Sequence, residues 1–121
     1  MALFARLNAV VLDCPDPRKL AAFYGELTGW PVEYDEPEWV TLASGGGMRL
    51  CFQEAPGHQG PRWPDPATPQ QVHLDFFVED LDEAEERVLA LGGTRAPHQP
   101  GDSWRVFADP AGHPFCLYEE G

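Results

Sequence analysis

His73 and Asp75 are the residues of this sequence whose types and spacing best suit chemistry. They stand two positions apart in the segment Val72–Val78, which the composition and alternation predict to be a β-strand. Successive side chains of a strand point to opposite faces, so both residues share one face, and the apolar residues beside them pack on the other. A histidine can act as a general base or bind a ligand, and an aspartate can do the same or assist it. We expect His73 and Asp75 to be catalytic; the alternative is a half-buried histidine with a hydrogen-bonded neighbour, beside a solvated aspartate.

Cys51 and Cys116 occupy equivalent positions in the two halves of the chain. Two thiolates with the imidazole of His73 would suit Zn²⁺ and leave a fourth position open. There is no Cys-x-x-Cys spacing, however, and free cysteines commonly serve as small buried side chains. With Cys14 the number of cysteines is odd, which favours a reduced, cytoplasmic protein.

Trp39 and Trp104 also occupy equivalent positions, on two strands expected at 39–43 and 104–108. Such a pair forms either aromatic walls of a ligand site or ordinary core. Strand alternation adds further polar and aromatic side chains to the same faces. The expected substrate-binding residues are Asp13, Trp39, Cys51, Trp104, Cys116 and Tyr118. Trp63, in a proline-rich stretch, is expected to be a lid or a dimer contact.

An internal repeat organises these residues. Residues 39–54 align with 104–119, with identities at Trp39/Trp104, Ala43/Ala108, Gly47/Gly112, Cys51/Cys116 and Glu54/Glu119. The earlier parts of the two copies match more weakly. We interpret the chain as a single domain, residues 1–121, with module one at 1–54, a proline-rich linker at 55–69 and module two at 70–121.

Each module predicts the same order of elements, βαβββ, and therefore an α+β fold. In module one a strand at Leu7–Leu12 precedes a helix that starts at Asp16-Pro17 and stops at Gly29. Module two has its helix from Asp80, with Glu83 three positions later, to Gly92. The remaining strands are expected at Val32–Tyr34, Trp39–Ala43, Arg49–Gln53, Thr94–Pro97, Trp104–Ala108 and Phe115–Tyr118.

Charge and length exclude several classes of function. The 121 residues carry 8 Lys+Arg and 20 Asp+Glu, a net charge of −12. Scattered basic residues argue against nucleic acid and against an anionic membrane surface. No apolar run approaches the roughly 18–20 residues of a membrane span, and the run Leu7–Leu12 is too short for a signal peptide, so we expect no membrane association. Gly-x-Gly-x-x-Gly, phosphate-loop and Gly-x-Ser-x-Gly motifs are absent.

The two βαβββ modules, with the segments DPRKLAAFYGELTGW, VHLDFFVEDLDEA and DPAGHPFCLYE, resemble the vicinal oxygen chelate superfamily. That superfamily includes glyoxalase I, the bleomycin resistance proteins and the extradiol dioxygenases. The resemblance implies cup-shaped mixed sheets with helices on the outer face, a small-molecule ligand inside the cup, and a homodimer.

The resemblance also implies four metal-ligand positions, which fall on Ala9, Cys51, His73 and Cys116. Alanine has no donor atom, and both positions where the family carries glutamate are cysteines. We therefore expect no metal cofactor; a divalent metal at His73, Cys51 and Cys116 is the alternative.

Two functions follow from the resemblance. The first is a glyoxalase-like protein that binds a small oxygenated or aromatic molecule in a cup between the modules, with lyase, isomerase or dioxygenase-type activity despite the incomplete metal quartet. The alternative is a non-catalytic protein that sequesters a drug or metabolite, as bleomycin resistance proteins do.

Overall fold

The chain divides into two compact units, Met1–His58 and Gln59–Gly121, which we call unit one and unit two. The computed structural model describes residues 5–119. The boundary between the units falls inside the expected linker, and no helix or strand occurs between Glu54 and Leu74. Five prolines from Ala55 to Pro69 account for this irregular path, because proline lacks the N–H that helices and sheets use.

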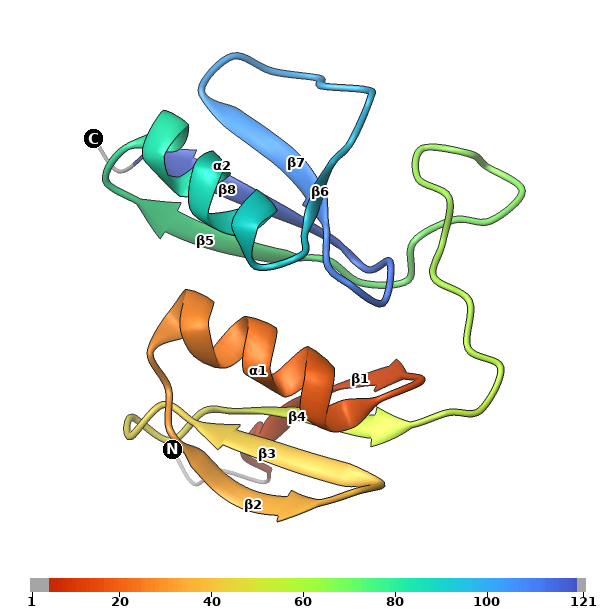
Figure 1. Ribbon diagram of the computed structural model, residues 1–121, viewed down its shortest axis with the longest axis vertical. Helices are drawn as coiled ribbons and strands as arrows, with labels where there is room; N and C mark the ends of the chain where they lie inside the picture. The colour runs from red at the N-terminus through yellow and green to blue at the C-terminus, as the bar shows by residue number, and fades with distance from the viewer. Residues whose placement is uncertain (1–4, 120–121) are drawn as a thin grey trace. The chain divides into compact units, whose positions relative to one another are not determined.

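Unit one has the order βαβββ: β1 (Ala9–Cys14), α1 (Pro17–Thr28), β2 (Val32–Glu36), β3 (Trp39–Ala43) and β4 (Arg49–Glu54). Its sheet order is β1-β4-β3-β2, with β1 parallel to β4 and the other pairs antiparallel. Figure 1 shows α1 lying along one face of this sheet.

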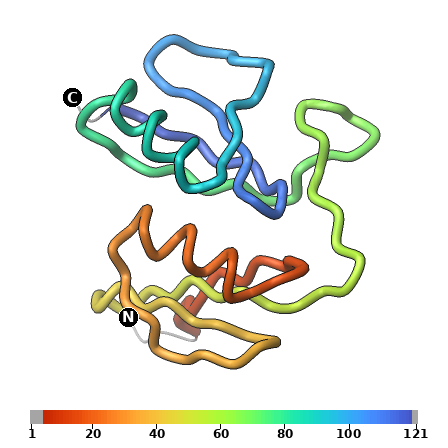
Figure 2. Tube along the Cα trace, in the orientation of Figure 1, coloured from red at the N-terminus to blue at the C-terminus, as the bar shows by residue number. Residues whose placement is uncertain are grey.

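Unit two repeats the arrangement with β5 (Leu74–Val78), α2 (Leu81–Ala90), β6 (Thr94–Arg95), β7 (Trp104–Ala108) and β8 (Pro114–Glu119). The sheet order is β5-β8-β7-β6, again with one parallel pair, β5 and β8. The traces of the two units follow the same path, strand, helix and then three strands (Figure 2). The predicted α+β fold of two βαβββ modules is confirmed.

The helices start and stop where the sequence indicates. The Asp16 carboxylate accepts a hydrogen bond from the Lys19 amide at 3.2 Å, and the Asp80 carboxylate accepts one from the Glu83 amide at 3.0 Å. Helix α1 ends at Gly29, whose φ of 75° is a left-handed conformation that glycine adopts without strain. Each helix buries its apolar stripe against its own sheet, through Leu20 and Phe23 in α1 and through Val88 in α2.

Some strand limits differ from the prediction. Strand β1 begins and ends two residues later than the predicted Leu7–Leu12, because its parallel register pairs Ala9–Cys14 with the whole of β4. Strand β5 begins at Leu74, so His73 precedes it. Strand β6 stops at Arg95; the Ala96 amide still bonds the Val106 carbonyl, but Pro97 has no N–H to continue the ladder.

Candidate functional site

Three donor groups gather at the start of β5 and the middle of β8 in unit two. His73 Nε2 lies 3.4 Å from Asp75 Oδ1, and ligand atoms of His73, Asp75 and Cys116 all lie within 4.8 Å of one another. Asp75 and Cys116 are partners in the parallel register of the two strands. The His73 and Asp75 side chains are 42% and 52% exposed, whereas Cys116 is buried. The cluster therefore combines two exposed side chains with a buried thiol.

The electrostatics of the cluster keep Cys116 protonated. Burial raises the pKa of the Cys116 thiol to about 11, with additional contributions from the charge of Asp75 and a hydrogen bond to it. Burial and the charges of Asp75 and Cys116 also raise the pKa of the Tyr118 phenol. Because the thiolate is the nucleophilic form of cysteine, Cys116 is not an activated nucleophile at neutral pH.

An aromatic wall stands beside this cluster. The rings of Trp104 and Tyr118 are stacked with centroids 5.8 Å apart and an interplanar angle of 17°. The two residues are partners in the β7–β8 register, which sets their rings side by side. Offset stacking of this kind leaves an aromatic face available to a flat ligand.

A cavity of about 170 Å³ lies between the wall and the cluster. Its lining includes Trp63, Gln70, His73, Trp104, Cys116 and Tyr118. A second hollow of about 160 Å³ is lined by Asp75, Phe76, Phe77 and Tyr118. Tyr118 borders both, so the two hollows are neighbours on unit two. Phe77 is 73% exposed and adds a further apolar ring to the second hollow.

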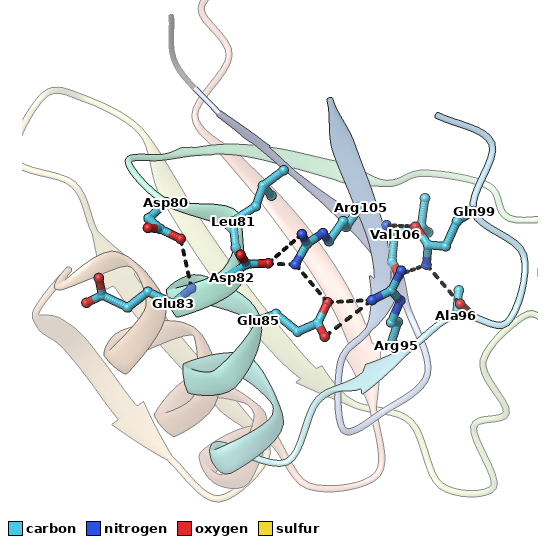
Figure 3. A network of polar contacts seen from close by, with 10 residues as sticks. All are labelled: Asp80, Leu81, Asp82, Glu83, Glu85, Arg95, Ala96, Gln99, Arg105 and Val106. Atoms are coloured by element: carbon cyan, nitrogen blue, oxygen red, sulfur yellow. Dashed lines mark hydrogen bonds and ion pairs between the residues drawn. The ribbon is translucent and has the colours of Figure 1, made fainter. Parts of the chain in front are cut away.

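The loop between β6 and β7 positions Trp104. The Gln99 side chain donates to the carbonyls of Ala96 and Val106 and accepts from the Val106 amide, as Figure 3 shows. A Cβ added to Gly101 would come within 2.2 Å of the Trp104 ring, so the indole packs directly on this glycine. The loop is thus tied to β7, and its glycine makes room for the indole.

On the helix side of β7, Arg105 connects the sheet to α2. Its guanidinium donates to Asp82 at 2.7 Å, to Glu85 at 3.2 Å and to the Leu81 carbonyl at 3.3 Å (Figure 3). Arg95 bonds the same Glu85 at 3.0 Å. These bonds hold α2 against β6 and β7 and so support the strand that carries Trp104.

Within unit one, two of the predicted site residues are joined through a third residue. Trp39 Nε1 donates to Thr41 Oγ1 at 2.9 Å, and Thr41 Oγ1 lies 3.5 Å from Cys51 Sγ, within hydrogen-bonding reach. Asp13 is exposed on β1, where its register partner is Gln53. Thus Trp39 and Cys51 are joined through Thr41, and His73, Asp75, Trp104, Cys116 and Tyr118 are brought together in unit two.

Sequence reasoning missed several residues around the cavity. Trp63, expected as a lid or a dimer contact, lines the cavity and contacts His98, with ring centroids 5.4 Å apart. Gln70 and Gly101, beside the cavity, and Thr41, in strand β3 of unit one, were not anticipated. The tryptophan in a proline-rich stretch was a usable signal for Trp63. The positions of Gln70 and Gly101 depend on the path of irregular segments, which the sequence pattern does not indicate.

Unit one also contains a hollow of about 440 Å³, between α1 and strands β2 and β3. It includes none of the predicted site residues. Three charged residues line it, Arg18, Glu26 and Asp35, and Arg18 and Asp35 are hydrogen-bonded to each other at 2.8 Å. Its lining contains no histidine, cysteine or tyrosine, in contrast to the unit-two cavity.

The family's metal quartet does not fit this chain. Ala9 has no donor atom, and Cys51 lies beside the hydroxyl of Thr41.

The fold matches that of known glyoxalase-related structures. A glyoxalase-related enzyme from Fulvimarina pelagi is 23% identical, covers 95% of this chain and 88% of its own, and has a TM-score of 0.67. A glyoxalase/bleomycin resistance protein/dioxygenase family enzyme from Burkholderia phytofirmans is 20% identical over 95% of this chain and 98% of its own, with a TM-score of 0.70. TnmS3, an antibiotic binding protein from a Streptomyces species, is 22% identical over 100% and 99%, with a TM-score of 0.62. At these identities the likeness shows the fold alone.

A search of curated proteins found no significant match. Within residues 5–119, no helix is long and apolar enough to cross a membrane. The family model described as "Glyoxalase-like domain" matches residues 9–118, nearly the whole chain. The chain therefore belongs to the glyoxalase-like family of the vicinal oxygen chelate superfamily, as its βαβββ repeat indicated.

Proposed function

We propose that this protein binds a small, flat molecule, aromatic and bearing oxygen atoms, in the unit-two cavity. The observation that carries the proposal is the stacked pair Trp104 and Tyr118 facing a cavity that also contains His73. Ligand pockets typically combine apolar and aromatic walls with a few polar groups that fix the ligand's orientation. Gln70 and His73 supply hydrogen-bonding groups for ligand oxygens, and the aromatic rings supply the apolar walls.

The size of the cavity limits the ligand. At about 170 Å³ it is smaller than the roughly 300–1,000 Å³ of sites for drug-sized molecules. A single aromatic ring with its substituents suits it. A longer molecule would extend past Tyr118 into the hollow beside Asp75 and Phe77, which adds about 160 Å³.

Binding without chemistry is the first form of the proposal. The Cys116 thiol stays protonated at neutral pH because its pKa is about 11, so covalent catalysis by this residue has no support. Among the fold relatives, TnmS3 is an antibiotic binding protein, which supports small-molecule binding as a role of this fold. We extend this role to the present chain as a proposal.

An enzymatic role is the second candidate, and one observation favours it. His73 Nε2 lies 3.4 Å from Asp75 Oδ1 at the cavity wall, so the carboxylate can orient the imidazole for proton transfer. A lyase or isomerase reaction needs such a base beside a bound oxygenated substrate. In this version turnover disappears in His73→Gln, while sequestration gives no product in either protein.

The binding proposal is tested by screening aromatic fragments by thermal shift and measuring the best one by calorimetry. We expect Trp104→Leu to weaken binding about 2- to 12-fold, since an aromatic pair contributes about 0.5–1.5 kcal/mol. Trp30→Leu in unit one makes the same chemical change outside the cavity and should leave the affinity unchanged. Equal losses in both variants, with both folded, would contradict the proposal. A loss in Trp39→Phe would show that unit one contributes to the site.

A further inference from the structure

We propose that Trp63 closes the unit-two cavity and restricts its ligand to a single aromatic ring. The inference rests on the proposed function, because it concerns the ligand of the same cavity. It assigns selectivity for ligand size to a residue in the irregular segment between β4 and β5.

Trp63 adds a third aromatic ring to the lining of the cavity. Trp104 and Tyr118 come from neighbouring strands of the sheet and stack on each other. Trp63 comes from outside the sheet and is half-buried, and its ring lies against that of His98, with centroids 5.4 Å apart and an interplanar angle of 48°. The cavity is therefore bordered in part by the sheet and in part by the segment that carries Trp63.

The loop around Trp63, residues 62–68, is held together by its own hydrogen bonds. The Asp65 amide donates to the Arg62 carbonyl at 2.7 Å, and the Thr68 amide donates to the Asp65 carbonyl at 3.1 Å. The Thr68 hydroxyl accepts from the Arg62 amide at 3.1 Å, which closes the loop. These bonds limit how far Trp63 can move while the loop keeps its shape.

Gly60 anchors the same segment on the turn between β7 and β8. A Cβ at this position would lie 2.8 Å from the carbonyl oxygen of Ala111 and from Cα of Gly112. Carbon atoms in favourable contact are about 3.5–4.0 Å apart, so this approach of two backbones requires a residue without a side chain. The turn leads into Pro114, which lines the cavity. The anchor therefore fixes the chain close to the cavity, just before Trp63.

His98 supports Trp63 from the loop between β6 and β7. The neighbouring Gln99 side chain is bonded to the backbone of Val106, so this part of the loop is tied to β7. Pro100 of the same loop also lines the cavity. The two loops thus meet through the rings of Trp63 and His98, and a contact between rings favours one orientation of the indole.

These contacts determine which ligands the cavity admits. Its volume of about 170 Å³ suits one aromatic ring, and the hollow beyond Tyr118 gives room for a narrow extension. A second ring fused beside the first widens the ligand and meets the indole of Trp63. Overfilling a packed site is destabilising, and a difference of one methylene in an apolar pocket changes discrimination by roughly 10–200-fold. A single ring should therefore be preferred by about tenfold or more.

The test compares benzamide with 1-naphthamide, which differ by one fused ring, by calorimetry on the full-length chain. The measured quantity is the ratio of their dissociation constants. We expect the unchanged protein to bind benzamide about tenfold or more tightly than 1-naphthamide. In Trp63→Ala, benzamide should bind about 2- to 12-fold more weakly, since one aromatic contact is lost, and the preference for it should disappear. Trp30→Ala in unit one is the matched control and should leave the ratio unchanged.

Two further variants test how Trp63 is held in place. Gly60→Ala forces the two backbones apart and should reduce the preference for benzamide, whereas Gly46→Ala, where a Cβ meets nothing closer than 3.7 Å, should not. His98→Ala should reduce the preference as well, and His98→Phe, which keeps a ring against Trp63, should restore it. Circular dichroism checks that each variant is folded.

The inference is overturned if the unchanged protein binds both amides equally well, or if folded Trp63→Ala keeps the preference for benzamide. A change of oligomeric state in Trp63→Ala with an unchanged ratio would make Trp63 a dimer contact instead. If benzamide binds and depends on Trp104 but the ratio does not depend on Trp63, this inference fails and the proposed function stands. If neither benzamide nor any screened fragment binds, both fail.

Discussion

Gly101 offers a way to move the aromatic wall without removing it. A Cβ at this position would lie 2.2 Å from Cη2 and Cζ3 of Trp104 and 2.5 Å from Cζ2. Carbon atoms in favourable contact are about 3.5–4.0 Å apart, so in Gly101→Ala the indole must shift by more than an ångström. Such a shift disrupts the stacking of Trp104 on Tyr118, now at 5.8 Å and 17°.

The expected cost follows from the interactions that are lost. An aromatic pair contributes about 0.5–1.5 kcal/mol, which corresponds to a 2- to 12-fold loss of affinity for a flat ligand. Trp104 is only half-buried, so the free energy of unfolding should fall by no more than about 1.5 kcal/mol. The change should appear mainly in binding, with the protein still folded.

Calorimetry with an aromatic fragment measures the affinity, and near-ultraviolet circular dichroism reports the displaced indole. Gly46→Ala is the matched control, because a Cβ there meets nothing closer than Ser44 Oγ at 3.7 Å. If Gly101→Ala alters the near-ultraviolet spectrum and leaves the affinity unchanged, Trp104 is not part of the binding site and the reasoning fails.

Three further predictions concern stability, the thiol and assembly. Arg105→Met should lower the free energy of unfolding by about 1 kcal/mol in thermal denaturation at low salt and by less at high salt, because its ion pairs with Asp82 and Glu85 are partly exposed. Burial raises the pKa of the Cys116 thiol from 9.0 to about 11. The contribution of this thiol to the free energy of unfolding is therefore complete below pH 9.0 and is lost as the pH rises through about 11. In denaturation scans at alkaline pH, the free energy of unfolding of Cys116→Ala should decline less steeply than that of the unchanged protein. An equally steep decline in both proteins would show that other groups cause it. We also expect a homodimer by light scattering, weakened by Phe77→Ser because Phe77 is 73% exposed; a monomer at micromolar concentration would contradict this.

Local sequence signals were sufficient for most of the fold. The Asp16 and Asp80 caps, the glycine stops and the apolar stripes each depend on a few neighbouring residues, and all of them form as expected. Strand alternation likewise indicated that His73 and Asp75 share a face, and their side chains lie 3.4 Å apart. Such features are predictable because their physical cause lies within one or two turns of helix or one strand.

The parts that could not be predicted depend on non-local packing. That Cys116 faces Asp75 is set by the register between β5 and β8, which are separated by a helix and two strands. Trp63 and Gln70 reach the cavity through a segment without periodicity, and the Gly101 contact depends on how the β6–β7 loop folds back. Thr41, which joins Trp39 to Cys51, looks in sequence like an ordinary strand residue.

The most direct test of the central claim is a nuclear magnetic resonance titration that follows the four tryptophan indole N–H signals while an aromatic fragment is added. Trp63 and Trp104 line the unit-two cavity, and Trp30 lines the separate hollow of unit one. We predict that the Trp63 and Trp104 signals shift together with a single dissociation constant and that the Trp30 signal does not move. A fragment that shifts Trp30 and leaves Trp63 and Trp104 unchanged would contradict the assignment of the binding site to unit two.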